Sequence, residues 1–81
     1  MDDILQSEES QQFFSLVHML QRSAMLHLGL IPDDEGMIHF NLGEAKAAID
    51  LLGTIEKRTK GNLAEIEETL LRGLISELRM N

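Results

Sequence analysis

Hydrophobic residues recur along three segments of the chain at the three- and four-residue spacing of amphipathic helices. This spacing predicts helices over about residues 10–30, 42–60 and 63–80, of which the first is the longest. Residues 37–40 show a brief alternation of apolar and polar positions, which indicates at most a short extended segment. Four residues are too few to form a sheet on their own. We therefore predict an all-α fold with three helices.

Residues that commonly begin and end helices stand near these predicted boundaries. Ser7 or Ser10 can cap the first helix, Asn41 the second and Asn62 the third, because their side-chain oxygens can accept a bond from a free backbone N–H. Gly61 is expected to end the second helix, since glycine adopts positive φ without steric cost. Pro32 falls in the turn that follows the first helix.

The first predicted helix is apolar around more than half of its circumference. An ordinary surface helix has an apolar arc only somewhat wider than about 100°. Two shorter helices of the same chain can cover part of this surface, and we expect the rest to contact other copies in a homo-oligomeric helical bundle. The predicted oligomer interface is the main apolar stripe, which consists of Phe13, Leu16, Val17, Leu20, Ala24, Leu28 and Ile31.

The length of the chain supports the same expectation. We predict an acidic, flexible lead-in at residues 1–9 and a single helical domain at residues 10–81. A domain of 81 residues buries a small core and usually needs disulfides, a metal or oligomerisation for additional stability. The sequence contains no cysteine, which excludes disulfides and thiolate metal sites and leaves oligomerisation.

The charge of the chain narrows the classes of partner. Fourteen acidic residues against seven basic ones give a formal net charge of −7. This charge repels nucleic acid and anionic membranes, and it favours a basic protein as an alternative partner for an acidic adaptor or regulator. The sequence begins without a basic and apolar signal segment and has no apolar run long enough for a bilayer, so we expect a cytoplasmic protein.

Catalytic and metal-binding patterns are missing from the sequence. His18 and His27 are nine residues apart, on opposite sides of the first helix, and neither has a second ligand one turn away. His39 falls in a loop. No serine stands in a nucleophile motif, and no glycine-rich phosphate loop occurs. We therefore predict no catalytic residue, no metal and no cofactor, and a protein that is not an enzyme.

One stretch concentrates basic residues next to a predicted helix start. Lys57, Lys60, Gly61 and Asn62 form a candidate anion site, because free backbone N–H groups at a helix N-terminus attract anions. The alternative explanation is structural: cations complement the C-terminal end of the second helix, and glycine and asparagine end one helix and start the next.

Several of these strings resemble a bacterial family of short helical proteins known as a domain of unknown function (number eighteen forty-four). The resemblance covers about residues 13–79, and the chain departs from the family near Gly53, where a leucine or methionine is usual. It implies a short helical bacterial protein and no activity. The strings are Phe13-x-x-Leu16-Val17, Ala24-x-x-x-Leu28-Gly29, Leu42-x-x-Ala45-Lys46-x-x-Ile49-Asp50-Leu51-Leu52, Glu56-Lys57-x-Thr59-Lys60-Gly61-Asn62-Leu63 and Leu78-Arg79.

Overall fold

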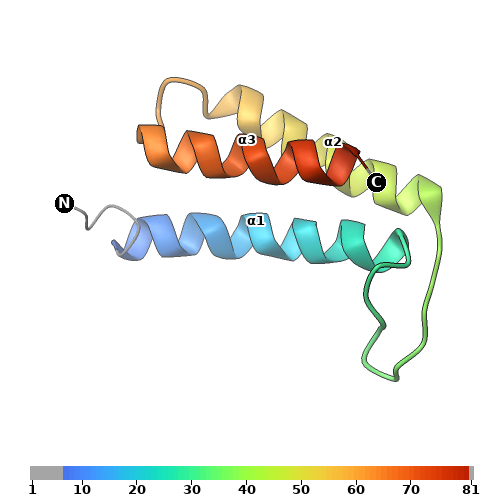
Figure 1. The fold of residues 1–81 in the computed structure, drawn as a ribbon. Coiled ribbons are helices and arrows are strands. Elements are labelled where there is room, and N and C mark those ends of the chain that lie inside the picture. Colours follow the sequence, from blue (N-terminus) through green and yellow to red (C-terminus); the bar gives the residue numbers. More distant parts are fainter. Residues whose placement is uncertain (1–6, 81) are drawn as a thin grey trace.

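The computed structural model describes residues 7–80 and contains three α-helices. These are α1 (Glu8–His27), α2 (Leu42–Arg58) and α3 (Glu65–Arg79). Consecutive helices run in opposite directions, with α1 in one layer and α2 and α3 together in the other (Figure 1). The three-helix, all-α prediction is confirmed, and the described residues include no strand, so residues 37–40 form an irregular loop.

The first two helices begin at predicted caps. The Ser7 hydroxyl accepts a bond from the Ser10 N–H at 3.1 Å, so α1 starts at Glu8 and takes in two residues of the predicted lead-in. Residues 1–6 of that lead-in lie outside the described part of the chain. Asn41 caps α2 through its side-chain oxygen, which accepts from the Glu44 N–H at 3.1 Å.

The end of α1 comes earlier than predicted because Gly29 terminates it. Gly29 has a φ of +77°, and its N–H donates to the Leu26 carbonyl, while the Leu30 N–H donates back to the Met25 carbonyl. This pair of bonds satisfies carbonyls that the last turn leaves free. Gly61 also has a positive φ, of +87°, two residues after the C-cap of α2 at Thr59.

The start of α3 corrects the prediction that Asn62 caps this helix. Its N-cap is Ala64, which has no side-chain oxygen, and the missing function is supplied from within the helix. The Glu67 carboxylate accepts a bond from the Ala64 N–H at 2.9 Å. The helix therefore starts two residues later than predicted, at Glu65.

The core lies where the three helices meet, and it is small. Among residues 7–80, eight hydrophobic side chains are buried, and three of them are alanines. These alanines belong to α1 and α2 and allow close packing of those two helices, which contact each other more extensively than either contacts α3. The three-helix fold measures 41 × 24 × 16 Å along its principal axes. The buried residues are Val17 and Ala24 of α1, Ala45, Ala48 and Leu52 of α2, and Leu71, Ile75 and Leu78 of α3.

Candidate functional site

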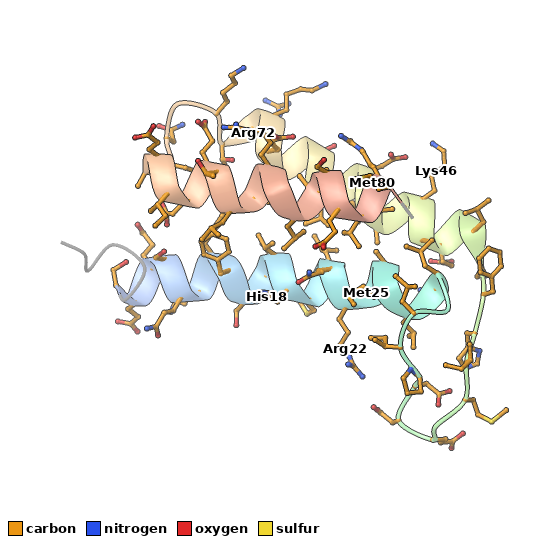
Figure 2. All side chains as sticks on the ribbon, in the orientation of Figure 1. His18, Arg22, Met25, Lys46, Arg72 and Met80 are labelled. Carbon is orange, nitrogen blue, oxygen red and sulfur yellow. The ribbon has the colours of Figure 1, made fainter. Side chains whose placement is uncertain are left out.

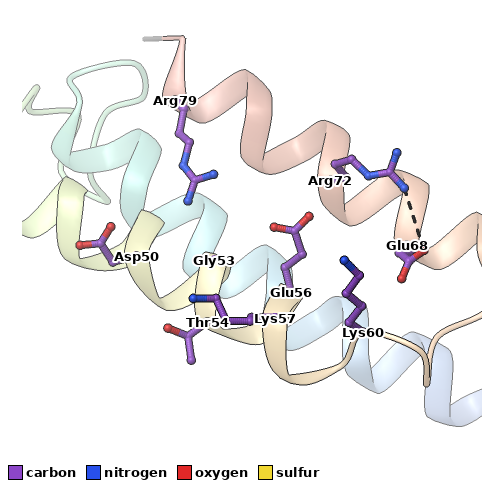
Figure 3. Close-up of a pocket in the computed structure, with 9 residues that line it drawn as sticks. All are labelled: Asp50, Gly53, Thr54, Glu56, Lys57, Lys60, Glu68, Arg72 and Arg79. Carbon is purple, nitrogen blue, oxygen red and sulfur yellow. Dashed lines mark ion pairs between the residues drawn. The ribbon is translucent and has the colours of Figure 1, made fainter.

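A charged groove runs between α2 and α3 and is the candidate ligand site. Figure 3 shows side chains from both helices directed into it. Its lining contains four basic and three acidic residues and no aromatic residue. The α2–α3 groove is lined by Asp50, Gly53, Thr54, Glu56, Lys57, Lys60, Glu68, Arg72 and Arg79.

Gly53 provides space for a cation in this groove. Arg79 extends from the last turn of α3 across to α2 at Gly53 (Figure 3). A Cβ atom at position 53 would lie 2.9 Å from the Arg79 Nη2 atom, which is closer than real Cβ contacts come. The absence of a side chain at position 53 therefore lets the guanidinium rest against the backbone of α2.

Most cations of the α2–α3 groove form no ion pair with the described residues. Arg72 makes a long ion pair with Glu68, at 4.0 Å between Nη2 and Oε1. Lys57, Lys60 and Arg79 form no ion pair with any other residue in the part of the chain that the structure describes. Their ammonium and guanidinium donors are available to a ligand or to water.

The groove includes half of the anion site predicted from sequence. Lys57 and Lys60 line it, whereas Gly61 and Asn62 lie in the turn beyond its end. Asn62 instead faces a hollow beside the first turn of α1. Sequence analysis missed Arg72 and Arg79, because only the packing of α3 on α2 brings them opposite the two lysines.

The structure changes the assignment of the predicted oligomer interface. Val17 and Ala24 are fully buried by α2 and α3 of the same chain, so they are core residues and cannot contact another subunit. Leu16 is 45% exposed. The other four predicted interface residues are partly buried, namely Phe13, Leu20, Leu28 and Ile31.

A different apolar surface of α1 faces solvent. We define the outer stripe of α1 as Leu16, Met19, Leu26 and Leu30. At 100° per residue the first three fall within an arc of about 80°, roughly opposite to the buried Val17, and Leu30 continues the stripe in the turn after the helix. Met19 is 63% exposed and Leu30 48% exposed.

Comparison with known protein families matches this chain over most of its length. A family model described as domain of unknown function (DUF1844) matches residues 10–81. The chain belongs to this family. The comparisons with curated proteins and with solved structures each gave no match. The DUF1844 match spans all three helices, and therefore includes both the α2–α3 groove and the outer stripe of α1.

A buried polar contact joins the ends of two helices in this DUF1844 chain. The Ser10 hydroxyl of α1 donates to the Glu67 Oε2 atom at 2.6 Å, and both residues are almost completely buried. The other carboxylate oxygen of Glu67 accepts from Ala64 N–H, so both oxygens have partners. Glu67 thus links α1 to α3.

The three histidines of the DUF1844 chain lie apart from one another. His18 packs beside Phe14 at 6.4 Å between ring centroids, and the His27 Nδ1 atom lies 2.8 Å from the Ser23 carbonyl. His39 contacts Asp33 in the α1–α2 loop. The described residues include no group of three or more His, Cys, Asp or Glu side chains placed to hold a metal ion. Within the same residues, no helix combines the length and apolar character needed to cross a bilayer.

Asp33 organises the loop between α1 and α2. Its Oδ1 atom accepts bonds from the Glu35 and Met37 N–H groups, at 2.9 and 2.8 Å, and its Oδ2 atom lies 2.6 Å from the His39 Nε2 atom. Because the side-chain bond to His39 and the backbone bond from Met37 favour the charged carboxylate, the pKa of Asp33 is lowered from its ordinary value of 3.8.

The lowered pKa of Asp33 predicts how the loop responds to acid. A carboxylate with a depressed folded-state pKa stabilises the folded loop above its unfolded pKa and loses this effect as pH falls through the folded value. We expect the amide NMR signals of Glu35 and Met37 to titrate together with a midpoint below 3.8. The variant Asp33→Ala should abolish this titration, whereas Asp34→Ala should retain it. A shared midpoint at or above 3.8 would contradict the assignment.

Proposed function

We propose that this protein is a small, non-enzymatic interaction module that associates with a second copy of itself through the outer stripe of α1. The single observation that carries the proposal is the exposure of this apolar stripe on the side of α1 opposite to the core. Figure 2 shows Arg22 projecting from α1 on a side away from α3, so this side of the helix is not covered by that neighbour.

The distribution of apolar side chains supports association. Eleven large hydrophobic residues are exposed among the described residues, against eight buried hydrophobic residues of which three are alanines. A single small core of this kind leaves an 81-residue chain marginally stable. Contact between outer stripes would remove Leu16, Met19 and Leu30 from water, at roughly 25 cal/mol for each Å² of apolar surface.

The distribution of charge favours a second copy as the occupant. Two chains with a net charge of −7 repel each other when their acidic surfaces meet. Arg22 is the only residue between positions 10 and 31 with a formal charge at pH 7, since the two histidines there are counted as neutral. The outer stripe of α1 therefore lies on a segment that itself carries no carboxylate, and the nearby Asp34 carboxylate is paired with Arg22 at 3.6 Å.

Measurement of molar mass by light scattering during size exclusion tests the proposal. The wild-type protein should elute as a dimer or larger assembly at concentrations near 100 μM, and Met19→Glu should weaken association by about 100-fold or more, because an unpaired carboxylate in a dry contact costs several kcal/mol. Circular dichroism should show unchanged helix content, since Met19 is largely exposed in the subunit.

The variant Leu51→Glu is the matched control. Leu51 is 53% exposed on α2, so the substitution adds the same charge to an exposed apolar position away from the outer stripe. It should leave the assembly intact. A monomeric wild-type protein at this concentration, or equal loss of association in both variants, would overturn the proposal. The first result would leave the acidic adaptor for a basic protein as the remaining hypothesis.

A further inference from the structure

We propose that the α2–α3 groove binds a small molecule with two or more phosphate groups. The groove is separate from the outer stripe of α1, so this proposal does not depend on self-association. It differs from the anion site predicted at the turn between the helices, because Arg72 and Arg79 replace Gly61 and Asn62 as its binding residues.

Positive charge is concentrated in the α2–α3 groove of an otherwise acidic chain. The lining contains four of the seven basic residues but only three of the fourteen acidic ones. The groove therefore has a formal charge of +1, while the rest of the chain carries −8. An anion is repelled over most of the surface and is attracted here, where several donors can reach it together.

The Arg79 guanidinium occupies space that a side chain at position 53 would take. Gly53 lies inside α2, where glycine is less favourable than alanine. Its φ is not in the positive region, and the atom that a Cβ would meet first belongs to Arg79. A Cβ at position 53 would therefore require the Arg79 guanidinium to shift, and no carboxylate in the described residues pairs with that guanidinium.

The arrangement of the cations indicates more than one anionic group on the ligand. Arg72 and Arg79 are seven residues apart on one face of α3, which places them about 10 Å apart along the helix. On the other side of the groove, Lys57 of α2 and Lys60 of the turn after α2 both line it. A ligand with two phosphate groups can contact Arg79 at one end and Arg72 with the lysines at the other.

The residue types in the α2–α3 groove favour phosphate over a nucleobase. Guanidinium groups donate two parallel hydrogen bonds to phosphate, and ammonium groups are effective point charges beside it. The lining offers no aromatic or large apolar side chain on which a nucleobase could stack. The nearby carboxylates Asp50, Glu56 and Glu68 mean that a weakly charged anion gains little, whereas a polyanion outcompetes them for the cations.

Isothermal titration with inorganic pyrophosphate, at constant ionic strength, tests the proposal. The wild-type protein should bind pyrophosphate saturably with a stoichiometry of one for each chain, and orthophosphate more weakly. Arg79→Gln should weaken binding by at least about tenfold, as expected for the loss of one charge-assisted contact. Arg58→Gln is the matched control, because Arg58 is an exposed cation of α2 outside the groove, and it should bind as the wild type does.

The variant Gly53→Ala separates binding from folding. The new methyl group displaces the flexible end of Arg79, whereas alanine improves helix propensity. We expect a higher Tm without ligand together with weaker pyrophosphate binding. Absence of saturable binding to the wild type, unchanged binding by Arg79→Gln, or equal loss in Arg58→Gln would overturn the proposal. The last of these results would mean that pyrophosphate responds only to the overall charge.

Discussion

Replacement of Leu52 by alanine is expected to lower the free energy of unfolding by about 2 to 5 kcal/mol. Leu52 is fully buried between the helices and is one of the largest side chains in the core. Because three of the eight buried hydrophobic residues are alanines, few neighbouring side chains can move to fill the resulting cavity. A domain of this length has a total stability of roughly 4 to 12 kcal/mol, so the loss is a large fraction of the whole.

Urea denaturation followed by circular dichroism measures this effect, and Leu51→Ala provides the control. Leu51 precedes Leu52 in α2 and has the same helix propensity, but its side chain is 53% exposed. We expect Leu51→Ala to cost less than about 1 kcal/mol, because its apolar surface is only partly removed from water. Equal losses in the two variants would contradict the helix orientation described above.

Replacement of Glu67 by alanine is expected to cost about 3 kcal/mol. The substitution removes the acceptor of the Ser10 hydroxyl and of the Ala64 N–H together. Ser10 is 4% exposed, and leaving its buried hydroxyl without an acceptor costs about 1 to 3 kcal/mol. The same change frees the first turn of α3, whose N-cap residue has no polar side chain.

Two further variants distinguish the hydrogen bonds of Glu67 from its charge. Glu67→Gln can accept from Ala64 and donate to Ser10, so it should lose only the charge interaction with the N-terminus of α3, about 0.3 to 1 kcal/mol. Glu65→Ala changes an exposed acidic residue in the same turn and should have a similarly small effect. If Glu65→Ala and Glu67→Ala were equally destabilising in urea, the charge and not the buried contact would explain the result.

The contrast between Asn41 and Asn62 shows which parts of the fold were predictable. Asn41 caps α2 through a residue three positions away, and such a local bond can be read from spacing alone. Asn62 has the same residue type before a helix, yet α3 begins at Glu65. Glu67 caps α3 instead, and its second carboxylate oxygen accepts from Ser10, which is 57 positions away in the chain. No periodic pattern contains that information.

Val17 and Ala24 show the corresponding limit for the apolar surface of α1. The sequence indicated that this helix has more apolar surface than the other two helices of the chain can cover. It could not indicate which part the chain itself covers, because that depends on how closely Ala45 and Ala48 allow α2 to approach. The proposed self-association surface therefore moved from the main stripe to the outer stripe, and Leu16, which is 45% exposed, is the one residue that the two stripes share.

The candidate ligand site was predictable only in the part that is contiguous in sequence. Lys57 and Lys60 were recognised because they are close to each other and to a helix end. Arg79 follows them by about twenty residues and has no local motif, and its relation to Gly53 arises from the antiparallel packing of α2 and α3. A glycine inside a helix was the one sequence signal that could have indicated this close approach.

The loop between α1 and α2 begins and ends at a single hydrogen bond, in which the Asn41 N–H donates to the His27 carbonyl at 2.8 Å. This bond fixes the separation of the two helix ends independently of the path taken by the residues between them. Changes of loop length near Gly36, where the backbone is exposed, would therefore leave the helix pairing in register. The loop is accordingly the position where this small fold can accept an inserted peptide or a fused domain.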